Sequence, residues 1–234
     1  LVKRGGAAAL VWPLIEELGI GKIRGMGGSS FRGGEFFEDI THFHVLIDPP
    51  RDGFFGVLRP TTGDSTPPKW VPADVSTYTS IHWDFEKTYE NLDKVLKDFQ
   101  GADPLKRFVQ EPAKKSIGVP IKEDILLNLT GPYVSGSWIE PPARLNSQTS
   151  LYALEIKDGI AAKGVIAKIR DRRPNDLEVE TEGSVVIYAP RNRGRRNMPE
   201  GFRVPEPGFM ILGKWFIFSD SREFLARIVR AKDR

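Results

Sequence analysis

The chain has 234 residues, with 34 Lys and Arg against 31 Asp and Glu, and its 40% hydrophobic content is ordinary for a globular protein. That length fits one large domain or two small ones, and the composition excludes collagen-like, wholly disordered and membrane-spanning classes. The absence of cysteine excludes disulfides, Cys-ligated zinc, iron–sulfur clusters and thiol nucleophiles. It suits a cytosolic protein and a Cys-avoiding envelope protein equally.

The first predicted element is a glycine-rich hairpin over residues 20–47, which turns near Gly25–Ser30 or at Gly33-Gly34. No apolar run reaches the roughly 20 residues of a transmembrane helix, so we expect no transmembrane segment in this stretch of chain. Because the chain starts at Leu1 without an initiator Met, we interpret it as a fragment of a longer protein.

Four apolar strands end in an Asp that is followed at once by a helical or apolar stretch. A carboxylate at this place can accept hydrogen bonds from the free N–H groups of a first helical turn. We therefore assign a capping role, rather than a catalytic one, to these residues: Asp48, Asp84, Asp158 and Asp220.

The strongest helix prediction covers residues 85–99, where apolar residues recur at steps of three and four and share one face. A second helix is expected near 104–117 with a break at Pro112, then a short piece over 121–129 and a last helix over 221–231. Two further hairpins are predicted, one over 177–189 that turns at Glu182-Gly183 and one over 208–219 that turns at Gly213-Lys214.

These elements predict an α+β fold of antiparallel sheets with amphipathic helices packed on one face. The same order of elements occurs twice in the chain. In residues 20–58 a hairpin is followed by Asp and an apolar tail, and in residues 177–231 hairpins are followed by Asp and a helix. This order indicates repeated strand–helix units. We therefore predict the C-terminal part of a first α+β repeat in residues 1–58 and a complete second repeat in 72–234. Residues 59–71, rich in Pro and Thr, would form a linker or an ordered loop.

Two segments resemble an uncharacterised family of repeated α+β domains in large exported bacterial proteins of planctomycete type. They are Trp70 to Asp74 (WVPAD), followed by a strand and a helix, and Phe209 to Ser221 (FMILGKWFIFSDS). The resemblance extends over most of the chain from about residue 35 onward. It implies an α+β repeat architecture and a periplasmic or exported location, and it implies no activity and brings no catalytic residues.

Three histidines form the sharpest candidate site. His42 and His44 alternate on a predicted strand, so their side chains point to one face, and His82 lies near the end of another strand. If the two strands were neighbours, three imidazoles could bind a divalent metal and leave a position for water, which would be a hydrolytic site. The structural alternative is a strand at a solvent-facing edge that carries polar residues.

A basic segment is the second candidate. Arg191, Arg193, Arg195 and Arg196, with Arg203 beyond, lie among prolines that predict a loop. Because Arg binds carboxylates and phosphates in a bidentate manner, the loop could bind a protein or an anionic polymer. No aromatic residue is interleaved in it, so we predict no specific nucleic-acid partner. The structural alternative is a solvated loop between two strands.

Other motifs are incomplete. The glycine-rich residues 19–30 lack the Gly-Lys-Ser/Thr of a phosphate-binding loop, and no G-x-S-x-G occurs. We therefore predict no catalytic residues and no cofactor. The leading hypothesis is a non-enzymatic envelope or exported binding or scaffold module, and the alternative is a metal-dependent hydrolase that uses the three histidines.

Overall fold

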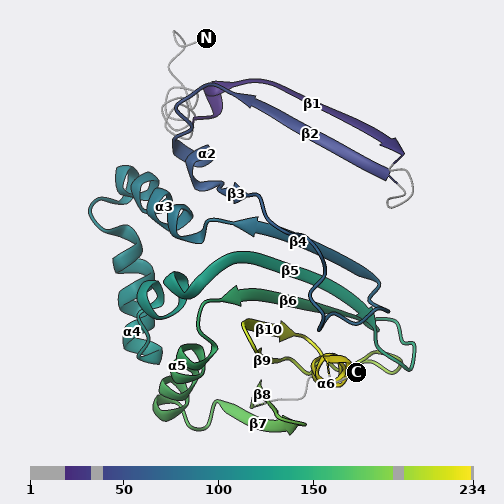
Figure 1. Ribbon diagram of the computed structural model, residues 1–234. Coiled ribbons are helices and arrows are strands. Elements are labelled where there is room, and N and C mark those ends of the chain that lie inside the picture. Colours follow the sequence, from purple (N-terminus) through teal and green to yellow (C-terminus); the bar gives the residue numbers. More distant parts are fainter. Residues whose placement is uncertain (1–18, 33–38, 192–197, 233–234) are drawn as a thin grey trace. The chain divides into compact units, whose positions relative to one another are not determined.

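The computed structural model describes residues 19–32, 39–191 and 198–232 and divides into two compact units (Figure 1). The first unit contains residues 1–59 and 87–104, and the second contains residues 60–86 and 105–234. A boundary thus falls at residue 59, beside the predicted end of the first repeat. The units are not consecutive segments, because residues 87–104 group with the first unit.

A two-stranded antiparallel hairpin forms much of the first unit. After the short helix η1 (Ile20–Lys22), β1 (Ile23–Arg32) pairs with β2 (Asp39–Ile47). Gly25–Ser30 lies inside β1, so the turn predicted there is wrong, and the alternative at Gly33-Gly34 falls outside the described residues. Most of the hairpin side chains are exposed, including Phe43 at 70%.

Two helices complete the first unit, α2 (Gly53–Val57) and α3 (Phe85–Gln100), the second as predicted. Side chains of α3 bind the last carbonyls of α2: Asn91 Nδ2 donates to Gly56 O at 2.7 Å and Thr88 Oγ1 to Val57 O at 2.9 Å. The predicted cap at Asp48 is wrong, because no helix begins there and its carboxylate binds Arg24 at 2.5 Å.

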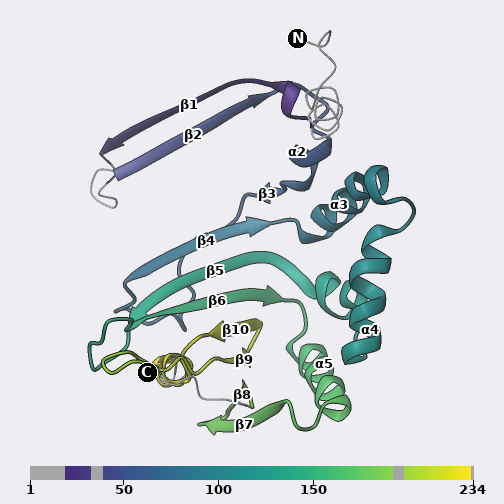
Figure 2. The same cartoon turned by 180° about the vertical axis from the view of Figure 1, so that it is seen from behind.

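The second unit is built on an antiparallel sheet of eight strands (Figures 1 and 2). Its order is β3-β4-β5-β6-β10-β9-β8-β7, so the last strand of the chain lies in the middle. The strands are β3 (Pro60–Thr61), β4 (Thr77–Trp83), β5 (Leu129–Ile139), β6 (Gln148–Ile156), β7 (Leu177–Glu182), β8 (Val185–Pro190), β9 (Gly208–Leu212) and β10 (Trp215–Ser219).

Helical turns connect β4 to its neighbour β5. After α3 come η2 (Lys106–Gln110), α4 (Glu111–Ile117), η3 (Ile121–Ile125) and η4 (Leu126–Asn128). The break expected at Pro112 takes the form of a change from the π-helical η2 to α4, which has Pro in its first turn. Proline is tolerated there because the first N–H groups of a helix have no intrahelical partner.

Both C-terminal hairpins are confirmed. Gly213 opens the β9–β10 turn with φ of +59°, a value that glycine adopts without steric cost. The β7–β8 turn contains Gly183, at φ +55°. The two long helices of this unit are α5 (Gly159–Arg172), between β6 and β7, and α6 (Arg222–Lys232), after β10.

The helix caps are only partly as predicted. Asp158 caps α5, since its Oδ1 accepts from Ile160 N at 2.7 Å. Asp220 does not cap α6: Ser221 Oγ accepts from Phe224 N at 3.1 Å instead. The carboxylate of Asp220 is turned to the sheet and to Arg203, so its predicted capping role is wrong.

Helices cover both faces of the sheet, where the sequence suggested one. Met210 on β9 packs in a cluster with Phe224 of α6, whereas the next residue, Ile211, packs in another cluster with Ile166 of α5. Successive residues of a strand point to opposite faces. We therefore name the two sides the α6 face and the α5 face.

The α+β class and the antiparallel sheets are confirmed, whereas the repeated strand–helix units are not. Residues 20–58 form a hairpin and a short helix, but 177–231 form four strands of a larger sheet. Of the Pro- and Thr-rich residues 59–71, residues 60–71 belong to the second unit. Thr61 pairs with β4, and Trp70 lies in the core at 6% exposure.

Candidate functional site

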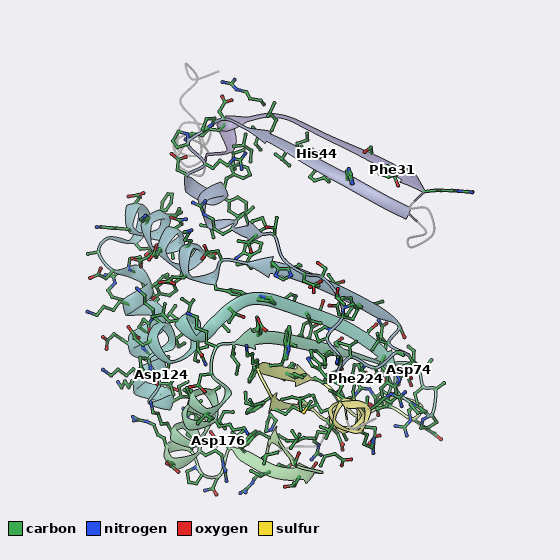
Figure 3. All side chains as sticks on the ribbon, viewed as in Figure 1. Phe31, His44, Asp74, Asp124, Asp176 and Phe224 are labelled. Atoms are coloured by element: carbon green, nitrogen blue, oxygen red, sulfur yellow. The ribbon has the colours of Figure 1, made fainter. Side chains whose placement is uncertain are left out.

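Two of the three candidate histidines lie together on the β1–β2 hairpin. His42 and His44 are exposed on β2, and their rings meet edge to face with centroids 5.9 Å apart. Phe31 of β1 lies against His42 at 5.4 Å, and Figure 3 shows Phe31 and His44 along the hairpin. The contact between the two rings agrees with the prediction that both imidazoles point to one face of the strand.

His82 lies on β4 in the second unit. Its Nε2 is 2.9 Å from the carbonyl oxygen of Asp64, and a Cβ added at Gly63 would lie only 2.1 Å from its Nδ1. Both ring nitrogens therefore face the loop that precedes β4. Within residues 19–32, 39–191 and 198–232, no three His, Asp or Glu side chains gather closely enough to hold a metal ion.

The basic segment falls largely outside the described residues, which include Arg191 and Arg203 but not Arg193, Arg195 or Arg196. Arg191 is exposed, and its Nη1 donates to Asn175 Oδ1 at 3.4 Å. Arg203 is placed quite differently, since only 4% of it is exposed.

Arg203 is the centre of a polar cluster at one end of the sheet. Its Nη2 donates to Asp220 Oδ2 at 2.6 Å, and its Nη1 lies 3.8 Å from Glu140 Oε2. Asn146 Nδ2 donates to the Arg203 carbonyl at 3.0 Å, and Ser221 Oγ donates to Glu140. The guanidinium is thus bound to carboxylates of the chain itself, where it holds three loops together.

A cavity of about 430 Å³ lies between the α5 face of the sheet and the helices beside it. Aliphatic and aromatic side chains from β5, β6, β9, β10, α5 and η3 line most of it: Ile125, Leu129, Leu154, Ile156, Ala162, Val165, Ile166, Ile169, Phe209, Ile211 and Phe216. Its volume is within the range of small-molecule sites, which are mostly apolar and concave.

The charged side chains that line this cavity are paired with opposite charges. Lys168 Nζ lies 2.9 Å from Asp124 Oδ2, and Arg173 Nη1 lies 3.3 Å from Asp176 Oδ2. Figure 3 shows Asp124 and Asp176 beside α5, far along the sheet from Asp74 and Phe224. The pairs leave the cavity without a net charge to attract an ionic ligand.

Two other hollows have similar volumes but different chemistry. One of about 510 Å³ in the first unit is lined by charged side chains such as Lys22, Arg51 and Asp52. The other, of about 450 Å³, lies beside Asp74 and Arg227. A hydrogen bond from Arg227 lowers the pKa of Asp74, against the opposing effect of partial burial. Neither hollow has the extensive aliphatic and aromatic lining of the α5 cavity.

The sequence contains a signal for this cavity in its apolar runs rather than in any motif. Phe209 to Leu212 and Trp215 to Phe218 are continuous apolar runs rather than alternating ones. Such runs indicate strands that are apolar on both faces. The apolar side chains on one face of these strands pack under α6. Those on the other face are only partly covered by α5, which leaves room for a ligand.

No protein-family model, no curated protein and no solved structure matches this chain. No helix in the described part of the chain is both long and apolar enough to cross a membrane. Its function is therefore inferred from its own geometry.

Proposed function

We propose that this chain is a non-enzymatic binding module whose second unit binds a small apolar ligand in the α5 cavity. The observation that supports it most is a cavity of about 430 Å³ lined almost wholly by aliphatic and aromatic side chains. Removing apolar surface from water contributes roughly 25 cal/mol per Å², so the lining offers affinity without any charged contact.

The lining also favours binding over chemistry. Its charged members, Asp124, Arg173 and Asp176, have partners of opposite charge close by. Asn128 is engaged with Asp158, since its Nδ2 donates to the Asp158 carbonyl at 3.2 Å. These polar groups are engaged with other residues of the chain, so the surface that remains for a ligand is mainly hydrocarbon.

We also infer an envelope or exported setting for the module, supported by the resemblance of WVPAD and FMILGKWFIFSDS to exported proteins. Cell fractionation of the native producer tests the location. Recovery of the protein in the periplasm or medium is expected, and recovery only in the cytoplasm contradicts this part of the proposal.

Ligand binding is tested with N-phenylnaphthylamine, a neutral fluorescent probe whose emission rises in apolar surroundings. We expect saturable binding to the wild-type chain. Ala162→Phe fills the cavity and should weaken binding by at least about tenfold, the equivalent of about 1.4 kcal/mol. Ala161→Phe is the matched control, because the neighbouring Ala161 is exposed on the same helix and does not line the cavity.

Val165→Phe, also in the lining, provides a second blocking variant, with exposed Ala167→Phe as its control. Circular dichroism of each variant verifies that it folds. The proposal is wrong if the wild-type chain shows no saturable binding, or if folded blocking variants bind as well as their controls.

A further inference from the structure

A row of side chains crosses the α5 face from strand to strand, next to the cavity. Directly opposed residues of antiparallel strands point to the same face. The pairings Thr79↔Ser135, Ser135↔Tyr152, Tyr152↔Phe218, Phe218↔Phe209 and Phe209↔Tyr188 therefore define one continuous line over β4, β5, β6, β10, β9 and β8.

The middle of this row is aromatic. The rings of Tyr152 and Phe218 are nearly parallel with centroids 6.4 Å apart, and those of Phe209 and Tyr188 are 5.3 Å apart. Tyr152 is 44% exposed, although its neighbours on the other face of β6 are buried. Of the four rings, that of Tyr152 is exposed, and those of Tyr188, Phe209 and Phe218 are half-buried.

The row is continuous with the cavity. Phe209 belongs to both, and Phe216 and Leu154, which also line the cavity, are the next residues on the same face beside Phe218 and Tyr152. From Phe209 to Ser135 the row crosses three strand spacings, or about 14 Å. A ligand that fills the cavity and extends past Phe209 would therefore meet this row.

The chemistry changes along the row. At its far end, the aromatic residues give way to the hydroxyl residues Ser135 and Thr79, which are opposed across β5 and β4, and Thr79 is exposed. None of the six residues in the row is charged. The site thus has an apolar cavity at one end, aromatic rings in the middle and uncharged hydrogen-bonding groups at the other end.

We infer that the ligand is a neutral single-chain amphiphile whose hydrocarbon chain occupies the α5 cavity, crosses the aromatic row and places an uncharged hydroxyl headgroup at Ser135 and Thr79. This inference rests on the proposed function and specifies the ligand class. The row itself contains no charged residue, and the guanidinium of Arg170, 6.0 Å from the centroid of the Tyr188 ring, lies at the end of the row away from Ser135 and Thr79. An ionic headgroup at Ser135 and Thr79 would therefore lose its hydration without compensation.

The test compares octanol and tetradecanol, each delivered from cyclodextrin, as competitors of N-phenylnaphthylamine. Tetradecanol should bind the wild-type chain at least about tenfold more tightly, because each additional buried methylene contributes to affinity. Tyr152→Ser should abolish most of this difference and leave octanol unaffected. Ile139→Ser is the matched control, as Ile139 is 48% exposed on the same face but four residues further along β5 than Ser135.

A second variant tests the headgroup position. Ser135→Ala should weaken the binding of tetradecanol several-fold and leave the affinity for tetradecane unchanged. Only the alcohol can form a hydrogen bond with Ser135. Equal affinities for the alcohol in wild type and Ser135→Ala would contradict the assigned orientation.

The possible failures are distinguishable. If octanol and tetradecanol bind equally while Ala162→Phe still blocks the probe, the ligand class is wrong and the proposed function stands. If neither alcohol nor the probe binds, the proposed function fails. If ultracentrifugation shows a wild-type dimer that Tyr152→Ser dissociates, the row is an interface between copies and the inference is overturned.

Discussion

The two faces of the eight-stranded sheet differ sharply although the same strands form both. On the α6 face, Met210 and Ile217 are opposed across β9 and β10 and are 0% exposed. One residue along, on the α5 face, Tyr152 is 44% exposed and Phe218 is half-buried. The strands are apolar on both sides, so the position of the covering helix, rather than strand composition, decides which side becomes a core.

The largest effect should come from breaking the packed face. Phe224→Ala removes a ring of 0% exposure from beneath α6 and should cost about 3–5 kcal/mol of unfolding free energy. Phe218→Ala, on the open face, should cost about 1 kcal/mol, because its ring is already half in water. Urea denaturation of both variants measures the difference, and equal losses would contradict the contrast between the faces.

A buried and an exposed ion pair extend the comparison. Arg203→Met removes a cation whose side chain is only 5% exposed and leaves Asp220 and Glu140 without it. The substitution should cost about 3–5 kcal/mol of unfolding free energy. Arg173→Met breaks a pair at the rim of the α5 cavity whose side chains are 44% and 40% exposed, and should cost less than about 1 kcal/mol. Thermal unfolding at low and high salt tests both values, and a small loss for Arg203→Met would show that the cluster is not a stabilising one.

The buried helix cap should also contribute more to the unfolding free energy than the exposed helix cap. Ser221→Ala removes the acceptor for Phe224 N and the donor to Glu140, both in a buried site, and should cost about 2 kcal/mol. Asp158→Ala removes the exposed cap of α5 and should cost about 1 kcal/mol. Differential scanning calorimetry compares the two, and a larger loss for Asp158→Ala would reverse the expected order.

The smallest effect concerns acid stability at α6. The hydrogen bond from Arg227 lowers the pKa of Asp74 in the folded chain. The pair therefore stabilises the fold above the pKa of the unfolded chain, and this contribution is lost as the pH falls below about 4. Because both side chains are partly exposed, its size should be under about 1 kcal/mol.

Asp74→Asn and Arg227→Gln should each remove this pH-dependent contribution. Unfolding free energies at about pH 6 and about pH 3 measure it. If both variants lose as much unfolding free energy between these two pH values as the wild-type chain does, the ion pair does not contribute to acid stability.

Local patterns predicted the local structure well. The helix over 85–99, the last helix and the turn at Gly213 follow from apolar spacing and from the freedom of glycine at positive φ. The α+β class followed from the alternation of these elements. Such features depend on neighbours in the sequence, which the sequence shows directly.

Features that depend on distant residues were not predictable in the same way. Asp220 looked like a helix cap because no local pattern shows that Arg203 and the β6 backbone take its carboxylate. The α5 cavity and the row through Tyr152 depend on β10 lying between β6 and β9, an order that apolar spacing does not specify. The three candidate histidines are divided between the two units, His42 and His44 on β2 and His82 on β4, a division that their spacing in the sequence does not indicate.

The position of β10 in the sheet also has a consequence for synthesis of the protein. β6 is complete at Ile156, but its second neighbour begins only at Trp215, so residues 157–214 leave the ribosome while that edge of β6 has no partner. An unpaired apolar strand edge is a template for association between nascent chains. While this stretch is translated, the open edge of β6 is therefore available for pairing with a neighbouring nascent chain.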